Sequence, residues 1–290
     1  MSMSPTASLL PRSTVGTSAG EIAYLDSGTG PPALFVHGVF FNGELWSGQL
    51  EAVSDLRRCL APDLLAHGRS ACPSTPLTIV DQAEALISFL DALQIDDVDL
   101  VGNDTGGAVA QLLVSMAPRR VRSLVLTNCD VEGSCPPEAF QPIVDTAREG
   151  QLAAGVVALA GDVEAIRAAV AMGFERPDQL SDDYLLAMFS PFLEQARAEA
   201  LEAYVAGLDD APLVAVHDDL AAFESPTLIV WGTGDEFFGI ESGRWLAATI
   251  AGADGVVELD GAKIFFPIER ATEFSQELRR FWTALVGRGA

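Results

Sequence analysis

The segment Gly102-Asn103-Asp104-Thr105-Gly106-Gly107 has the residue types and spacing best suited to chemistry. It follows a short apolar run, residues 98–101, and precedes an apolar stretch with helical spacing. A sharp turn from strand to helix strains its central residue and needs very small residues two places away, which Gly102 and Gly106 provide. The pattern therefore predicts that Asp104 stands at the carboxyl edge of a sheet, at the positive end of a helix.

The elements that must position this turn alternate between strand and helix. Apolar runs predict strands, and apolar residues at helical spacing predict helices between them. The predicted strands are 21–25, 33–36, 58–61, 98–101, 123–127, 226–231 and 255–259, and the predicted helices are 78–93, 108–117 and 272–286. This alternation indicates an α/β fold with a doubly wound, mostly parallel sheet covered on both faces.

The alternation stops after the strand at residues 123–127, which we expect to be the sixth strand of the sheet. Residues 131–217 are rich in alanine and predict helices throughout. We interpret them as a helical cap, or lid, inserted into a core formed by residues 1–130 and 218–290. The alternative interpretation is that these helices only extend the core.

Composition limits the partners. The chain has 290 residues and a net charge of -24, which argues against nucleic acid and anionic membranes as partners. Its four cysteines form no metal-binding pattern, so we expect no metal and no cofactor. No apolar leader is apparent, and a cytoplasmic location is expected. The oligomeric state is open, with a homodimer as one option.

Several motifs, in order, resemble the α/β-hydrolase superfamily from about Ile22 to Trp282. His37-Gly38 with Trp46 is similar to the family's oxyanion loop and the helix behind it. Asp63 with residues 67–70 is similar to the turn that follows a strand in this family. The turn around Asp104 is similar to the nucleophile elbow. Residues 231–235 are similar to the strand that delivers the catalytic acid, which implies this role for Asp235.

An aspartate at the elbow is similar to the haloalkane dehalogenase, fluoroacetate dehalogenase and epoxide hydrolase branches of this family. The resemblance implies that Asp104 is a nucleophile that forms an ester with an sp³ carbon. It also implies an oxyanion hole made by the backbone N–H groups of Val39 and Thr105, with Phe40 beside it.

The sequence departs from the family where a histidine is expected after the last strand. Alignment on Phe266-Pro267 and Glu269 places Phe265 there, and a slip of two residues would place Lys263 there instead. The chain has three histidines, His37, His67 and His217. We expect none of them to replace the missing base. A base normally activates the water that hydrolyses the ester, so hydrolytic turnover is doubtful.

Other departures narrow the chemistry. A halide-binding tryptophan is absent beside the elbow, where Thr105 stands, and this disfavours dehalogenation. Tyr184 and Tyr204 lie in the predicted cap, where they would either protonate an epoxide or pack at the edge of the core. Asn128 and the nearby Asp130 resemble the alternative acid position of some relatives. Asn128 would either hydrogen-bond in the site or cap its strand.

The leading hypothesis is an enzyme that uses Asp104 as the nucleophile on a small apolar organic substrate. In one alternative Asp104 is an acid or base in a cofactor-free elimination, isomerisation or cyclisation, paired with Asp235 and balanced by the charge of Lys263. In another the protein only binds a ligand. Phe265 is either natural or a deliberate replacement that traps the ester.

Overall fold

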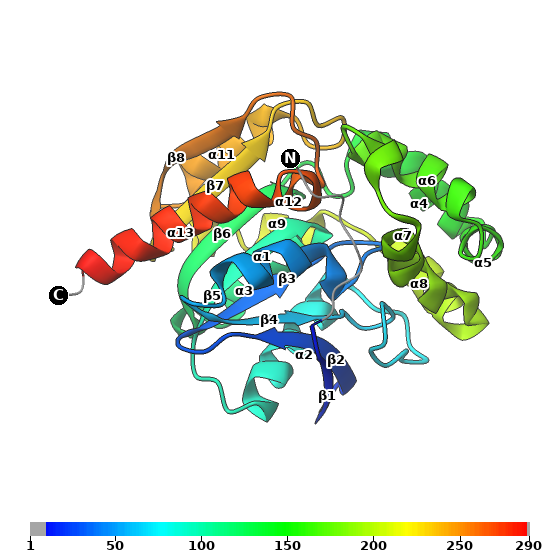
Figure 1. Ribbon diagram of the computed structural model, residues 1–290, viewed down its shortest axis with the longest axis horizontal. Coiled ribbons are helices and arrows are strands. Elements are labelled where there is room, and N and C mark those ends of the chain that lie inside the picture. The colour runs from blue at the N-terminus through cyan, green and yellow to red at the C-terminus, as the bar shows by residue number, and fades with distance from the viewer. Residues whose placement is uncertain (1–9, 289–290) are drawn as a thin grey trace.

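The structure is a computed structural model that describes residues 10–288. Its centre is an eight-stranded sheet in the order β1-β2-β4-β3-β5-β6-β7-β8 (Figure 1). Strand β2 pairs antiparallel with β1 and β4, and the other neighbours are parallel. The strands are β1 Arg12–Thr17, β2 Gly20–Ser27, β3 Pro32–Val36, β4 Arg58–Pro62, β5 Val98–Asp104, β6 Val121–Cys129, β7 Thr227–Gly232 and β8 Ala253–Leu259. The predicted α/β fold is confirmed.

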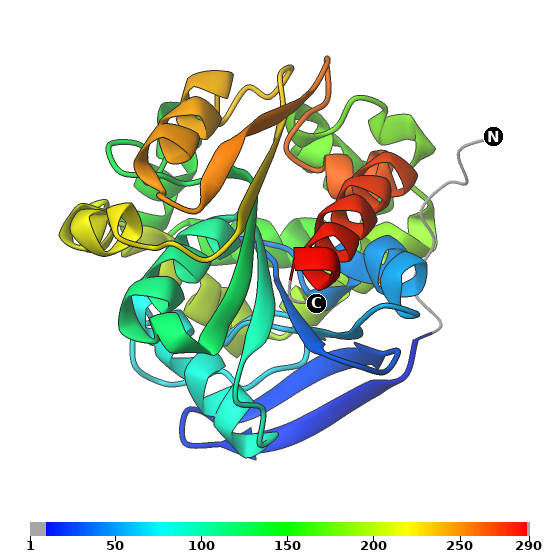
Figure 2. The same ribbon diagram turned by 90° about the vertical axis from the view of Figure 1, so that its left-hand side faces the viewer.

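Helices cover both faces of this sheet. Figure 2 shows α1 and α13 on one side and α2, α3 and α11 on the other. Their bounds are α1 Ser47–Val53, α2 Ile79–Ala92, α3 Thr105–Met116, α11 Ile240–Thr249 and α13 Ala271–Arg288. Because both faces are covered, the central strand β5 is apolar and buried along most of its length.

A set of helices follows the sixth strand, as predicted. They are α4 Gln141–Arg148, α5 Leu152–Leu159, α6 Val163–Val170, α7 Asp182–Phe189, α8 Gln195–Ala206, α9 Ala211–Ala215 and α10 His217–Ala221. Helices α4 to α8 gather at one end of the molecule (Figure 1), whereas α9 and α10 contact α3. We call α4 to α8 and their connections the cap, and the boundaries given above for the inserted domain remain predictions.

Strand β1 and the helices α11 and α12 (Phe266–Glu269) lie outside the sequence prediction. Strand β1 is short and half exposed at the sheet edge, so it carries no apolar run. Helix α11 buries only Gly243 and Leu246, so its apolar stripe is narrow. Within residues 10–288, no helix has both the length and the apolar character needed to span a bilayer.

Candidate active site

Asp104 lies at the last position of β5, directly before α3. Its backbone is left-handed, with φ 56° and ψ -138°, a conformation that costs a residue other than glycine roughly 1–3 kcal/mol. A side chain at Gly106 would collide with the carbonyl oxygens of Val36 and His37, and one at Gly38 would collide with the Asp104 carboxyl group. The two glycines therefore allow β3 and the elbow to approach closely enough to fix this carboxyl group.

Two backbone donors meet the Asp104 carboxyl group. The N–H groups of Thr105 and Val39 both donate hydrogen bonds to it. Thr105 is also the first residue of α3, so the carboxyl group faces the positive end of that helix. These donors lower the pKa of Asp104, but burial and the charge of Asp130 raise this pKa well above its usual range.

Asp130 is the second carboxyl group of the site. It follows β6 and accepts hydrogen bonds from the Thr105 hydroxyl group and the Cys135 thiol. Burial raises the pKa of Asp130 to about 7 in spite of these donors. Because two buried carboxylates repel each other, the Asp104–Asp130 pair keeps a proton near neutral pH.

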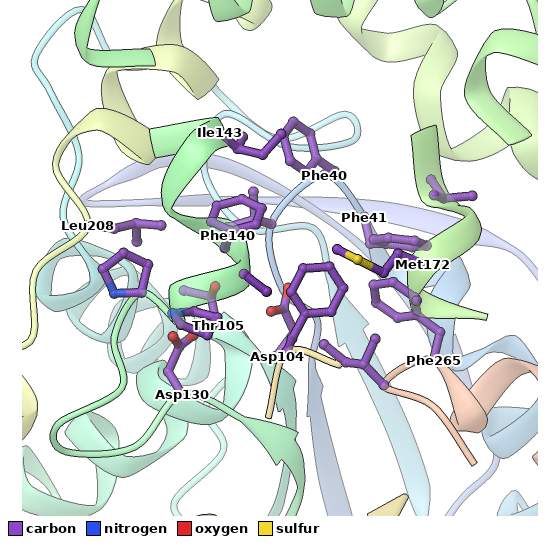
Figure 3. A pocket seen from close by; sticks show the side chains of 18 of the residues that line it. Phe40, Phe41, Asp104, Thr105, Asp130, Phe140, Ile143, Met172, Leu208 and Phe265 are labelled. Carbon is purple, nitrogen blue, oxygen red and sulfur yellow. The ribbon is translucent and has the colours of Figure 1, made fainter. Parts of the chain in front are cut away.

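A cavity of about 210 Å³ opens onto both carboxyl groups. Figure 3 shows Asp104, Thr105 and Asp130 on one side of it and phenylalanine side chains around them. The remaining lining is almost wholly apolar: Val39, Phe40, Phe41, Pro136, Pro137, Ala139, Phe140, Pro142, Ile143, Ala169, Val170, Met172, Gly173, Leu208, Phe237, Ile264 and Phe265. The cavity therefore suits a small, mostly apolar molecule with one reactive polar group.

No histidine lines this cavity. His37 Nε2 accepts a hydrogen bond from the N–H of Leu64 at 2.9 Å, and its Nδ1 lies 2.8 Å from the Gly38 carbonyl oxygen. His67 is buried with its Nδ1 2.9 Å from the Leu65 carbonyl oxygen. His217 Nδ1 lies 2.5 Å from Glu132 Oε2. Each imidazole is thus engaged away from the Asp104 carboxyl group.

Two apolar side chains reach the cavity from the loop after β8. The Phe265 ring lies between Phe41 and Phe174, with centroids 4.2 Å and 5.0 Å away. Ile264 also lines the cavity, and its carbonyl oxygen accepts a hydrogen bond from Asn103 Nδ2 at 3.0 Å. Since Asn103 precedes Asp104, this bond ties the loop to the elbow. Sequence reasoning singled out Phe265 and missed Ile264.

Asp235 and Asn128 lie together, but neither lines the cavity. Asn128 Nδ2 donates to Asp235 Oδ2 at 2.8 Å, and Asn128 Oδ1 accepts from the Gly232 N–H at 2.7 Å. Asp235 also accepts from the N–H groups of Phe237 and Phe238 at 3.1 Å and 3.2 Å. Burial raises the pKa of Asp235 to about 6, while these hydrogen bonds lower it. Asn128 and Asp235 therefore stabilise the turn after β7.

The remaining predicted residues are also outside the cavity lining. Tyr184 and Tyr204 are fully buried in α7 and α8, and their hydroxyl groups have no hydrogen-bond partner among the described residues. Lys263 Nζ donates to Glu236 Oε1 at 2.6 Å and to the Met172 carbonyl oxygen at 3.1 Å. Of the sequence candidates, the structure brings together Asp104, Thr105, Val39, Phe40 and Phe265, and it adds Asp130.

The cap is fastened to the core beside Phe265. The Glu269 carboxylate accepts hydrogen bonds from the N–H groups of Glu175 and Arg176, each at 2.7 Å. Arg270 binds the Glu175 carboxylate through two hydrogen bonds of 2.7 Å. The N–H of Phe265 donates to the Gly173 carbonyl oxygen at 3.2 Å. We call this set of contacts the cap latch.

Comparison with known proteins agrees with this fold. Residues 31–269 match the model of the alpha/beta hydrolase fold family. A haloalkane dehalogenase of Mesorhizobium japonicum is 36% identical over 121 residues, which are 41% of this chain and only 39% of that protein. The non-heme chloroperoxidase CPO-A1 of Kitasatospora aureofaciens is 30% identical over 241 residues, 81% of this chain and 85% of that protein.

Solved structures show the same fold. The haloalkane dehalogenase DbeA from Bradyrhizobium elkani superposes with a TM-score of 0.84 at 20% identity, covering 96% of this chain and 99% of that one. An enol-lactonase from Burkholderia xenovorans LB400 has a TM-score of 0.76 at 25% identity, over 93% of this chain and 100% of that one.

Proposed function

Because the chain belongs to the α/β-hydrolase fold family, we propose that it is an enzyme whose Asp104 carboxyl group acts on a small, largely apolar organic molecule. The elbow and the two backbone donors support this role for Asp104. The apolar cavity above it supports the substrate class.

Proton transfer is the reaction that we propose for this site. The observation that carries it is the second carboxyl group, Asp130, which is buried beside Asp104 and shares Thr105 with it. One ionised and one protonated carboxyl group provide a base and an acid in the same cavity. An elimination, isomerisation or cyclisation needs this combination, since one carboxyl group removes a proton from the substrate while the other returns one.

Nucleophilic attack by Asp104 is the second candidate. The N–H groups of Thr105 and Val39 hold the carboxyl group at the edge of the cavity and would stabilise charge on an ester oxygen. An ionised Asp104 oxygen would attack an sp³ carbon, and the leaving group would depart with the electrons of the broken bond. With no imidazole on the cavity wall, the resulting alkyl ester would persist.

Intact-mass spectrometry and proton NMR distinguish the two reactions. The wild type is incubated with epoxides and bromoalkanes for the mass measurement, and with a panel of ketones and alkenes in D₂O for NMR. Turnover or deuterium incorporation without an adduct supports proton transfer, and a stable mass increase that Asp104→Asn abolishes supports the nucleophile.

The matched control is Glu236→Gln, which removes a carboxylate outside the cavity lining. It should behave as the wild type in both measurements. If the wild type shows neither adduct nor turnover, the protein is a ligand-binding relative and the proposal of an enzyme is wrong. The cytoplasmic location and the homodimer option remain predictions from the sequence.

A further inference from the structure

The cavity combines an acidic end with an aromatic wall. Its polar side chains are Asp104, Thr105 and Asp130, and no lysine, arginine or histidine is among its lining residues. Five phenylalanines line the rest: Phe40, Phe41, Phe140, Phe237 and Phe265. Two buried carboxyl groups without a basic partner are costly, so a ligand that supplied a positive charge would relieve that cost.

Three of the rings stand edge to face beside one another. The Phe140 ring lies 6.1 Å from Phe40 and 6.4 Å from Phe237 between centroids. Figure 3 shows Phe40 and Phe140 on the side of the cavity away from Asp130. The electron-rich faces of aromatic rings attract cations, most strongly where water is excluded. An aromatic wall opposite carboxyl groups is therefore suited to a cationic group on an apolar body.

The backbone of Phe40 supports a role for its ring in binding. Phe40 has φ 67°, in the left-handed region that an aromatic residue rarely occupies. Its ring is only partly buried yet lines the cavity. A strained backbone of this kind is typical of positions held for function rather than for stability.

We propose that the substrate is a small amine, which the cavity binds as an ammonium ion between the Asp104–Asp130 carboxyl pair and the phenylalanine wall. This assignment names the substrate class of the proposed function. It rests on that proposal only because it places the substrate at the same carboxyl groups. The amine nitrogen faces the carboxyl groups and its hydrocarbon part packs against Phe40, Phe140 and Phe237. A neutral or anionic molecule of the same shape would leave the carboxyl groups without a counter-charge.

Below neutral pH, binding of an ammonium ion should release the proton of Asp130 and leave the other proton of the pair in place for proton transfer. The pKa of Asp130 is about 7, so below neutral pH the cation competes with that proton. The groups that face Asp130 are the carboxyl groups of Asp104 and Asp210, the Thr105 hydroxyl, the thiols of Cys129 and Cys135 and the Tyr204 phenol. Burial raises the pKa of the Cys129 thiol, which therefore stays neutral. Burial raises the pKa of both Cys135 and Tyr204, so neither supplies charge near neutral pH. Affinity for the amine should therefore increase from pH 5 to pH 7.5.

Isothermal titration calorimetry of the full chain tests the proposal with three matched probes: benzylamine, benzyl alcohol and benzoate. At pH 7.5 benzylamine should bind about tenfold or more tightly than benzyl alcohol, as expected for a cation on a desolvated aromatic wall and carboxyl pair. This preference should shrink at pH 5. Repeating the titration in buffers of different ionisation enthalpy should show proton release at pH 6.

Three variants refine the test. Asp130→Asn should remove the preference for benzylamine while affinity for benzyl alcohol is kept, and Phe140→Leu should weaken benzylamine more than benzyl alcohol. The control Glu236→Gln should change neither affinity, because it removes an acidic charge outside the cavity lining.

Equal affinity for benzylamine and benzyl alcohol, tighter binding of benzoate, or no binding of any probe would overturn the proposal. Such a result leaves the role of Asp104 standing if adducts or turnover still depend on it. Conversely, amine binding together with turnover that survives Asp104→Asn would overturn the proposed function and leave the amine assignment standing.

Discussion

Asp104 and the loop residues Ile264 and Phe265 line the same cavity but have opposite chemical character. The carboxyl group is held by backbone donors, whereas the loop offers two hydrocarbon side chains where an imidazole would be needed to activate water. Hydrolysis through the proposed Asp104 ester would therefore lack an imidazole on the cavity wall to activate water.

Introducing a histidine into this loop should create hydrolytic activity. Ile264→His and Phe265→His each place an imidazole on the cavity wall, and a base of this kind typically contributes about 10²–10⁴ in rate. We expect at least one of them to shorten the lifetime of an Asp104 ester by about 10² or more, measured as loss of the adduct in intact-mass spectra.

The matched control is Phe237→His, which places an imidazole on the same cavity wall from the turn after β7. It should leave the adduct stable. If neither loop variant hydrolyses the ester, the histidine position predicted from the sequence is wrong. If Ile264→His alone is active, the sequence alignment was displaced by one residue.

At the scale of elements, the cap latch joins the segment after α6 to the residues that follow β8. Glu269 is buried, and its carboxylate accepts two backbone N–H groups that would otherwise lack partners at the cap. Burial raises the pKa of Glu269 while these two bonds lower it. The latch therefore positions Gly173 and Phe265 at the edge of the cavity.

Glu269→Ala should loosen the cap selectively. The N–H groups of Glu175 and Arg176 lose their part-buried hydrogen bonds, which costs about 0.5–1.5 kcal/mol each. Hydrogen exchange measured by mass spectrometry should increase at residues 171–177 and much less in β5 and β6.

Glu273→Gln serves as the control, because Glu273 contacts Arg270 only at 3.6 Å and is half exposed. It should leave exchange at residues 171–177 unchanged. Uniformly faster exchange across the sheet in Glu269→Ala would contradict a local latch and indicate a general loss of stability.

The sequence predicted what depends on local pattern. The apolar run of β5 and the glycines around Asp104 specify the elbow, because only small residues tolerate that approach. Asp130 was noted only for its resemblance, together with Asn128, to the alternative acid position of some relatives, because a residue one place beyond its strand carries no pattern of its own. Its place after a strand parallel to β5 was the available signal.

Side-chain direction could not be predicted in the same way. Tyr184 and Tyr204 lie in cap helices as expected, but helical period does not reveal which face turns to the cavity and which to the core. Both rings point into the core, where Tyr204 packs 5.7 Å from the His67 ring. The sequence also indicated that Asp235 follows the strand that became β7. It could not reveal the hydrogen bonds that Asp235 makes with Asn128 and with the turn after β7, because these follow from tertiary packing.

At the scale of the whole molecule, buried ionisable groups make stability depend on pH in both directions. The pKa of Asp130 is raised above its unfolded value, so the folded state holds more protons and its stability falls as pH rises from about 4 to about 7. His37 and His67 act oppositely, since burial lowers the pKa of His37 to about 4 and that of His67 to about 3. Because both rings stay neutral in the folded state, their contribution to the stability of the folded protein is lost as pH falls below about 6.5.

Asp130→Asn should isolate the carboxyl contribution. The variant keeps both histidines but removes the cost of ionising a buried acid, which for a pKa raised from 3.8 to about 7 is ~4 kcal/mol above pH 7. In urea titrations, the free energy of unfolding of the variant should increase relative to that of the wild type from pH 5 to pH 7.5.

Asp55→Asn is the control, because Asp55 is exposed and hydrogen bonding to Arg279 lowers its pKa. Its difference from the wild type should be constant above pH 5. A constant difference for Asp130→Asn as well would show that Asp130 is already ionised across this range.

The cap latch also has a consequence for the order of synthesis. The cap helices emerge from the ribosome before Glu269 and Arg270, which fasten them and which follow only after β7 and β8. Since folding during synthesis proceeds from the amino terminus, the cap cannot be fastened beside the phenylalanines of the cavity until residues 269 and 270 have emerged. A ribosome-stalled fragment that ends before residue 269 should therefore be a better client for chaperones than the released protein.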